Sequence, residues 1–435
     1  MEILLIVDLV LLLVLMLTGV PVAFSFAAAA CFLVLTGDYS HPQFLISSGY
    51  GKTASPVILA IPLYILAGAV MSSGGISVRL LDLANSIIGH KRGGLGVVVI
   101  VSTAIFGAIS GMASSAVAAI GSIMIPRMVD KGYDRGYACS LVAASAVLAL
   151  LIPPSATMII YGWVSGTPIL QVFLAPVIPG FILIGLFCFW NYVMTRKMDL
   201  TLEEKLPTKQ YVVNVFQQFK ISGWGLVMPM IILGFIYGGI TTPTEAAAVA
   251  VFYALPVGFV IYKELTFKSF YDASWKACQV TAAMMILIFC STLIAKIYTM
   301  EDVPQYILGF LLSITDNKYL ILMMVNVFLI MIGLLMEDVS GFLLATPLLM
   351  PVMNEIGVHP VHFAAIMGTN LGMGLITPPT APILFLSTLV GKADFSTVIR
   401  PTLVFVFLAY LPVVILTTYL PELSLWLPRL LTGIN

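Results

Sequence analysis

The sequence predicts an all-α polytopic membrane protein with an inverted structural repeat, two re-entrant hairpins and two broken helices. Composition is the first ground, because 60% of the 435 residues are hydrophobic and only 9% are charged, against about 25% charged in soluble domains. The mean hydropathy is +1.08, which no ordinary soluble fold could accommodate. Basic and acidic residues number 20 each, so no bulk charge attracts nucleic acid. We therefore expect a protein embedded in a lipid bilayer.

Apolar segments of the right length are the second ground. A helix that crosses the hydrocarbon core needs about 20 apolar residues. Candidate spans are residues 2–18, 21–36, 56–74, 136–165, 169–193, 222–240, 244–262, 275–295, 362–390 and 396–420. Two further stretches, 95–128 and 319–353, break in the middle at small or polar residues, and we expect each to enter and leave the membrane on one side. Residues 194–221 form the one long polar segment and the predicted linker between two halves.

A match between these halves at a constant offset of 225 residues is the third ground. Prolines carry the match, and they interrupt helices because they lack a backbone N–H donor. The matched positions are Pro126 and Pro351, Pro153-Pro154 and Pro378-Pro379, and Pro176 and Pro401. The same offset pairs residues 76–90 with 301–315, two short amphipathic stretches that suit the membrane interface better than a crossing.

The distribution of basic residues supports an inverted arrangement. If the hairpin makes no net crossing, each half crosses the membrane five times, and an odd number of crossings inverts the second half. This topology places 16 of the 20 basic residues on one face. The other face keeps four, Lys52, Lys296, Lys318 and Arg429. By the positive-inside rule the basic face, which holds the linker, is cytoplasmic, and both termini lie on the opposite face.

The repeat divides the chain into eight predicted segments. The first half comprises scaffold spans (1–75), an interfacial arm helix (76–92) and one half of a transport domain with hairpin and broken helix (93–193). The cytoplasmic linker (194–221) follows. The second half comprises scaffold spans (222–300), a second arm helix (301–318), the other half of the transport domain (319–420) and a C-terminal tail (421–435).

The functional chemistry is expected where hairpin tips meet broken helices near the membrane midplane. The predicted tips are 107–115 and 333–341, and the predicted breaks are 145–155 and 368–380. Non-helical backbone at this depth must be buried or line a cavity. Its carbonyls, with Ser, Thr and Asn oxygens, suit Na⁺, a hard cation. The predicted sodium ligands are Ser110, Gly111, Ser114, Ser115, Ser145 and Pro153, with Asp338, Ser340, Gly341, Thr369, Asn370, Gly374 and Thr377 in the second half.

A carboxylate substrate is expected at the same depth. Half-helices that begin near Ser155 and Thr380 would direct the positive ends of their dipoles toward it. The predicted substrate-binding residues are Ser155, Thr157, Asn370 and Thr380. The alternative is that the glycines and serines only allow close helix packing, as small residues do in membranes.

Two acidic residues, Glu337 and Asp338, also lie at apparent membrane depth, which favours a functional role. Their first-half counterparts are Met112 and Ala113, so any such role belongs to the second half alone. The alternative is a hairpin tip wet enough to solvate both acids. By contrast, Glu245 ends the sequence Thr242-Pro243-Thr244-Glu245, which fits a capping box with proline at the first helical position. We therefore expect Glu245 to be structural.

Other motifs give no support for an enzyme or a bound cofactor. The five cysteines occur singly in apolar stretches without a CxxC pair, which argues against disulfides and zinc. His359 and His362 have HxxH spacing but no third ligand nearby, and a loop-facing pair is the preferred interpretation. The chain has no GxSxG motif with a partner His, no HExxH and no P-loop, so an ATP-driven permease would need a separate ATPase.

Five stretches closely resemble the large membrane subunit of tripartite ATP-independent periplasmic (TRAP) transporters. They are Gly19 to Ala23, Phe106 to Gly121 (FGAISGMASSAVAAIG), Ile152 to Ser155, Thr242 to Ala247, and Gly374 to Pro379 (GLITPP). The resemblance covers essentially the whole chain. Met112 departs from it, because a small hydroxyl residue is expected at this place in the Gly-x-x-Ser-Gly tip, and this weakens a role for position 112 as a sodium ligand.

The resemblance implies an elevator-type transporter of the ion-transporter superfamily, coupled to sodium and located in the bacterial inner membrane. It implies three interaction partners: an organic-acid substrate, an extracytoplasmic substrate-binding protein, and a separate small membrane subunit of about four spans. C4-dicarboxylates, sialic acids and sugar acids remain open as substrates. The alternative is a stand-alone sodium/divalent-anion carrier, which shares paired hairpins and broken helices but needs no binding protein.

Overall fold

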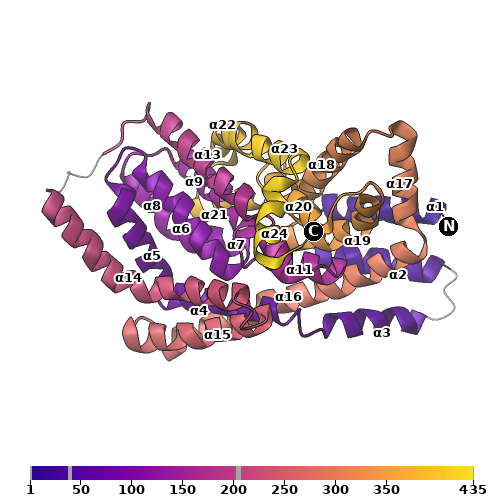
Figure 1. Ribbon diagram of the computed structural model, residues 1–435, viewed down its shortest axis with the longest axis horizontal. Coiled ribbons are helices and arrows are strands. Elements are labelled where there is room, and N and C mark those ends of the chain that lie inside the picture. The colour runs from indigo at the N-terminus through magenta and orange to yellow at the C-terminus, as the bar shows by residue number, and fades with distance from the viewer. Residues whose placement is uncertain (1, 38–41, 202–206, 435) are drawn as a thin grey trace.

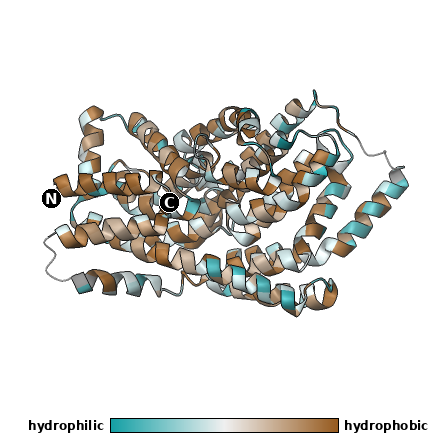
Figure 2. Cartoon of the chain, turned by 180° about the vertical axis from the view of Figure 1, so that it is seen from behind, coloured by the Kyte–Doolittle hydropathy of each residue, from teal (hydrophilic) through white to brown (hydrophobic). Residues whose placement is uncertain are grey.

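A computed structural model describes residues 2–37, 42–201 and 207–434, and every regular element within these ranges is helical. The helices form two groups that run side by side (Figure 1). We call α1–α4 and α14–α16 the edge bundle, and α6–α13 and α18–α24 the inner bundle. Two further helices, α5 and α17, connect them. Much of the helical ribbon consists of hydrophobic residues, drawn in brown (Figure 2), as expected for helices surrounded by lipid.

The edge bundle is held together by α4 (Ala60–Ser73), which packs against both α15 and α16. Its other helices are α1 (Glu2–Leu17), α2 (Val22–Thr36), α3 (Pro42–Thr53), α14 (Thr208–Tyr237), α15 (Pro243–Pro256), continued by the π-helical η3 (Val257–Ile261), and α16 (Phe267–Met300). The predicted capping box begins α15: the Glu245 carboxylate accepts the Thr242 backbone N–H at 2.7 Å, and Thr242 Oγ1 accepts the Glu245 N–H at 3.3 Å. The structural role of Glu245 is confirmed.

The inner bundle begins with a hairpin made of α6 (Gly94–Ser110), α7 (Ala113–Ala116), the π-helical η2 (Val117–Gly121) and α8 (Ser122–Asp130). We call it hairpin 1. A broken helix follows, with α9 (Arg135–Ala146), α10 (Leu148–Leu151) and α11 (Ala156–Ser165), and then α12 (Ile169–Leu174) and α13 (Val177–Thr195). Of the most apolar stretch within Arg135–Ser165, 94% is buried in the protein, against 28% for Lys209–Tyr237. The broken helix is therefore the core of the molecule, whereas α14 faces outward.

The second half of the inner bundle repeats this order. Hairpin 2 comprises α18 (Lys318–Leu335) and α19 (Asp338–Glu355); the second broken helix comprises α20 (Pro360–Gly374) and α21 (Pro382–Gly391). After them come α22 (Phe395–Val404), the π-helical η4 (Phe405–Tyr410), α23 (Leu411–Tyr419) and α24 (Glu422–Thr432). The halves interlock, because α9 packs on α21 and α22 while α11 packs on α19 and α20.

Helix boundaries recur at the offset found in the sequence. α6 ends at Ser110 and α18 at Leu335, α7 begins at Ala113 and α19 at Asp338, and α9 begins at Arg135 and α20 at Pro360. Each of these pairs differs by 225 residues, and both Pro-Pro peptide bonds, Pro153-Pro154 and Pro378-Pro379, are cis. The repeated prolines therefore mark repeated chain breaks.

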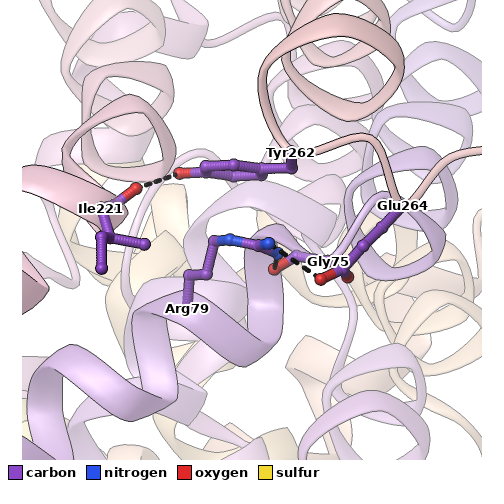
Figure 3. A network of polar contacts seen from close by, with 5 residues as sticks. All are labelled: Gly75, Arg79, Ile221, Tyr262 and Glu264. Atoms are coloured by element: carbon purple, nitrogen blue, oxygen red, sulfur yellow. Dashed lines mark hydrogen bonds and ion pairs between the residues drawn. The ribbon is translucent and has the colours of Figure 1, made fainter.

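The connecting helix α5 (Ile76–Ala84), continued by the π-helical η1 (Asn85–Gly89), bends by 70° away from α4. Arg79 clamps it to the edge bundle (Figure 3): its guanidinium pairs with Glu264 at 2.8 Å, donates to the Gly75 carbonyl at 3.0 Å and lies 3.9 Å from the centre of the Tyr262 ring. Gly75 has φ +76°, and a Cβ there would collide with the Glu264 carboxylate. The second connecting helix, α17 (Val303–Ile314), packs on α16 and α19.

Several elements differ from the expectation. Neither α3 nor α24 was predicted, because both are amphipathic or mixed in composition rather than continuously apolar. α14 begins at Thr208, well before the predicted residue 222, and so occupies part of the predicted linker, of which residues 202–206 lie outside the described ranges. Seven helices in the described ranges are long and apolar enough to cross a membrane, or eight with the bent pair α4 and α5–η1. α1 and α2 are shorter, with 16 and 15 residues.

We expect the start of α14 to face the cytoplasm, because the basic residues gather on the linker side. A cysteine introduced by Gln210→Cys should not react with a membrane-impermeant maleimide added to intact cells, whereas Gln43→Cys in α3 should react. Both native side chains are exposed. The exposed native thiols, Cys31 and Cys278, are first replaced by serine. Labelling of Gln210→Cys without permeabilisation would contradict the topology.

Candidate functional site

The tip of hairpin 1 is joined to the broken helix beside it. Gly111 ends α6 in the left-handed region, with φ +69°, and its carbonyl accepts the backbone N–H of Ala156, the first residue of α11, at 3.1 Å. A Cβ on Gly111 would lie 2.9 Å from that nitrogen. Only glycine therefore allows this contact. The contact pairs the Gly111 carbonyl with the Ala156 N–H, two backbone groups that the helix breaks would otherwise leave unpaired.

Most of the polar residues predicted for the first half-site lie within four residues of Gly111 or Ala156 along the chain. Ser110, Ser145, Ser155 and Thr157 are buried, whereas Ser114 and Ser115 are half-buried. The hydroxyls of Ser155 and Thr157 lie 2.8 Å apart at the start of α11. Ser145 lies inside α9, where its hydroxyl donates to the Leu141 carbonyl at 2.7 Å. The helix is first interrupted at Val147, close to the predicted start at Ser145, and after the short α10 the chain is irregular from Ile152 to Ser155, with Pro153 within it.

The second hairpin brings a carboxylate to the first. Asp338 begins α19 and only 8% of it is exposed. Its Oδ1 accepts the Val339 N–H at 2.9 Å, and the carboxyl group also lies against the backbone amide of Ala113 at the tip of hairpin 1. Its Oδ2 is buried and has no hydrogen-bond partner. The two tips therefore meet, and they meet at a buried carboxylate oxygen that is left unsatisfied. Ser340 and Gly341, in the same first turn, are also buried.

Asn370 carries a second unsatisfied oxygen. Its Nδ2 donates to the Asn326 side-chain oxygen at 2.9 Å and to the Ile366 carbonyl at 2.8 Å, but its Oδ1 is buried without a partner. The same Asn326 oxygen accepts from Thr418 at 3.1 Å. Asn326, in α18, was not among the predicted site residues. An asparagine within an apolar span was the sequence signal that could have identified it.

The second break is shorter than predicted and begins later. The expectation of irregular chain over 368–380 is wrong for its first part, because α20 continues through Gly374 and the irregular residues are 375–381. Thr369 is accordingly helical and donates to the Ala365 carbonyl at 2.9 Å. Within the break, Thr377 donates to the Met373 carbonyl at 2.7 Å. Thr380 is exposed and its hydroxyl bonds the Leu334 carbonyl in hairpin 2.

The physical reason for the longer helix is close backbone packing. A Cβ on Gly374 would lie 2.6 Å from Gly333 Cα and 2.6 Å from the Ile330 carbonyl oxygen. The glycines therefore serve close contact between α18 and α20, which is the packing role left open for small residues. Here that interpretation holds for Gly374, whose neighbours are backbone atoms.

The assembled site is suited to a hard cation and an anion. It combines neutral hydroxyl, amide and carbonyl oxygens with one buried carboxylate, and α11, α19 and α21 begin around it. Within the described ranges no group of three or more His, Cys, Asp or Glu side chains could hold a metal ion. His359 caps α20 through the Val361 N–H, and His362 bonds the Thr417 carbonyl at 2.8 Å, so both histidines have structural partners. The expected loop-facing pair is wrong for His362, which is buried within α20.

Sequence comparison identifies relatives over nearly the whole chain. Residues 9–423 match the family described as tripartite ATP-independent periplasmic transporter, DctM component. The sialic acid TRAP transporter large permease protein SiaM of Vibrio cholerae is 34% identical, covering 96% of this chain and 97% of the relative. The C4-dicarboxylate TRAP transporter large permease protein DctM of Pseudomonas aeruginosa is 34% identical over 86% of each.

A third relative is longer. The isethionate TRAP transporter permease protein DctMQ of Oleidesulfovibrio alaskensis is 36% identical over 94% of this chain, which spans 64% of that relative. Among solved structures, the YdaH transporter of Alcanivorax borkumensis has a TM-score of 0.63 at 14% identity and 90% coverage of both chains. MtrF of Neisseria gonorrhoeae, of a class of antimetabolite efflux pumps, has a TM-score of 0.59 at 12% identity, with 90% of this chain and 84% of that chain covered. These structures share the fold.

Because Gly333 and Gly374 are in close backbone contact, adding one methyl group at Gly374 is expected to lower the free energy of unfolding. Gly374→Ala should lower stability by about 1–3 kcal/mol, because the opposing atoms belong to backbone and cannot turn aside. Gly185→Ala in α13 is the matched control, since nothing lies within 4 Å of the added Cβ, and it should not lower the melting temperature. Thermal unfolding in detergent measures both. Equal melting temperatures for the two variants would show that the contact is not tight.

Proposed function

Because the chain belongs to the tripartite ATP-independent periplasmic transporter family, as its DctM component, we propose that it imports an organic acid together with sodium. It is a multi-pass protein of the inner membrane. The proposed substrate is a carboxylate such as a C4-dicarboxylate, a sialic acid or a sugar acid. The proposed partners are an extracytoplasmic binding protein, which delivers the acid, and a small membrane subunit. Relatives named for sialic acid and C4-dicarboxylates support this class of substrate.

The observation that best supports sodium coupling is the unsatisfied Oδ2 of Asp338 at the meeting point of the two hairpin tips. A buried carboxylate oxygen without a partner is costly, and a bound cation would remove that cost. The unsatisfied Oδ1 of Asn370 offers a neutral oxygen ligand of the same kind. We propose sodium at these oxygens, and the acid near Ser155 and Thr157, at the N-terminus of α11.

The alternative is a stand-alone sodium/divalent-anion carrier that needs no binding protein. Uptake into proteoliposomes, with and without the cognate binding protein, separates the two possibilities. A tripartite transporter should take up the acid only when the loaded binding protein is present. Equal uptake without it would favour the stand-alone carrier. No enzymatic activity is proposed, and the relatives are permeases.

Asp338→Asn should raise the sodium concentration needed for half-maximal uptake about tenfold or more, since loss of 1.4 kcal/mol of binding is tenfold in affinity. Glu355→Gln, at the other end of α19, is the matched control: it also removes one acid from the same helix, but the native residue is exposed and the change should stay within about twofold. Sodium titrations of uptake in proteoliposomes measure both. An unchanged sodium dependence in Asp338→Asn would exclude this carboxylate from the ion site.

We also propose an elevator movement, in which the inner bundle slides as one body past the edge bundle. The interlocked halves support this, because a gate in one half alone would separate residues that share a substrate. The helix α5 is suited to be the arm between them. Arg79 fixes it to Glu264 of the edge bundle, and Asp82 pairs with Arg127 of hairpin 1 at 3.0 Å. The second arm in this proposal is α17.

A disulfide between the bundles should stop this movement. A Cβ on Gly68 in α4 would lie 3.0 Å from the Cβ of Ser110 in hairpin 1, so a shift of about half an ångström brings the pair to the usual Cβ separation of about 3.5–4.5 Å. Gly68→Cys combined with Ser110→Cys, in a chain otherwise free of cysteine, should lose uptake on oxidation and regain it on reduction.

Two controls accompany this prediction. Each single variant, Gly68→Cys or Ser110→Cys, shows how its own substitution affects uptake, which is needed because Ser110 is also a predicted sodium ligand. Uptake by either single variant should not change on oxidation. Mass spectrometry of the oxidised double variant gives the crosslinked fraction. Full transport by a completely crosslinked protein would rule out the elevator.

A further inference from the structure

Asn370 is held from two sides, and both contacts are made by its amide nitrogen. Nδ2 donates one hydrogen to the carbonyl of Ile366, four residues earlier in α20, at 2.8 Å. It donates the other to the side-chain oxygen of Asn326 in α18, at 2.9 Å. An amide nitrogen carries two hydrogens, so both are used. Only Oδ1, which is buried without a partner, is left to bind anything else.

The Ile366 carbonyl decides which way the amide of Asn370 faces. A carbonyl oxygen can only accept a hydrogen bond, so the amide atom next to it must be the nitrogen. Asn326 must then present its own oxygen to the second hydrogen of that nitrogen. Thr418 of α23 reinforces this arrangement, because its hydroxyl donates to the same Asn326 oxygen at 3.1 Å. Three helices of the inner bundle thereby fix the side on which the Asn370 oxygen lies.

The first half of the chain lacks this network. At the offset of 225 residues, the equivalents of Asn370, Asn326 and Thr418 are Ser145, Val101 and Val193. The Ser145 hydroxyl donates its one hydrogen to the Leu141 carbonyl, again four residues earlier in its helix, at 2.7 Å. One acceptor satisfies the hydrogen of a hydroxyl, whereas an amide nitrogen needs two. The additional acceptor, Asn326, therefore occurs only in the half whose predicted sodium ligand has a second hydrogen to place.

Hydrogen bonds between buried side chains also hold membrane helices together. The inner bundle contains such a bond between Thr402 of α22, which donates at 2.9 Å, and Ser140 of α9, both buried. Neither residue is a predicted sodium ligand, and both hydroxyls have a partner. Helix packing alone explains a contact of this kind. It does not explain a contact that leaves a buried oxygen of Asn370 unsatisfied.

We propose that Asn326 is a positioning residue for sodium binding, which acts through Asn370 and is itself oriented by Thr418. By accepting the second amide hydrogen, Asn326 keeps the Asn370 oxygen directed at the ion. This inference rests on the proposed function, in which that oxygen is a sodium ligand. A ligand that is already oriented loses less freedom when the ion binds, and loss of a group behind a metal ligand typically lowers affinity about 10- to 100-fold.

The test measures sodium binding without the acid. The sodium dissociation constant of the complete transporter in detergent is obtained from the rise in its melting temperature as sodium replaces choline. Asn326→Leu should raise this constant about tenfold. Thr418→Val, which removes only a hydroxyl group, should raise it by a smaller factor. Thr402→Val is the matched control: it removes a buried hydrogen bond between helices and should lower the melting temperature without changing the sodium dissociation constant.

A second background separates positioning from a general weakening of the bundle. Asn370→Ser gives the second half the residue found in the first, which has no second hydrogen to place. In that background Asn326→Leu should leave the sodium dissociation constant unchanged, because the group it positions is gone. The same increase in both backgrounds would overturn the proposal. So would an unchanged constant in Asn326→Leu alone, and if that variant does not fold, Thr418→Val decides.

Asn370→Ala distinguishes failure of this inference from failure of the proposed function. If the sodium dissociation constant rises in Asn370→Ala but not in Asn326→Leu, the sodium site stands and the positioning role is wrong. If the constant is unchanged in Asn370→Ala, then Asn370 is not a sodium ligand. That part of the proposed function is then wrong, and the positioning role falls with it.

Discussion

The interrupted helices leave backbone N–H and C=O groups without their usual helical partners. The need to pair these groups is the constraint on which the rest of the fold depends. At membrane depth no water is available to bond a free N–H or C=O group, so each break must find its partner within the protein. In the first half the Gly111 carbonyl takes the Ala156 N–H. In the second, the Leu375 carbonyl takes the Ile383 N–H. These contacts require that the breaks be enclosed, and the interlocking of α9 and α11 with the helices of the second half encloses them.

Much of this architecture could be predicted from the sequence, because the features that interrupt helices are visible in it. Prolines at one offset located both breaks, small and polar residues within two apolar stretches located both hairpins, and apolar length located most spans. The exact ends of the irregular segments could not be predicted. Gly368 to Gly374 contains three glycines, a composition typical of a break, yet it is helical because its glycines lie against other helices. Sequence alone does not distinguish a glycine needed for a turn from one needed for close packing.

In the candidate site, too, some residues could be predicted from the sequence, whereas their contacts could not. The hairpin acids and Asn370 could be singled out from their polarity within apolar stretches. Which of their atoms lack a partner depends on geometry, and the contact of Asp338 with Ala113 joins residues that are 225 positions apart. Asn326 escaped attention because it stands alone in an apolar helix, and only the folded chain places its oxygen between Asn370 and Thr418. Likewise nothing in the sequence brings Lys52 and Lys296 together, and only the fold places both at one cavity.

The asymmetry between the two hairpin tips has a thermodynamic consequence. Where one half carries Asp338, the equivalent position in the other half is Ala113, which offers only a backbone amide. A cation beside Asp338 would be electrically balanced as soon as it bound. A cation in the other half would stay uncompensated until an anion arrived next to it. If both halves bind sodium, as proposed, the second half would fill by itself, whereas ion and acid in the first half would favour each other's binding by the same factor. In that mechanism a single acidic residue, present in one half only, would make the two halves differ in the order in which they bind.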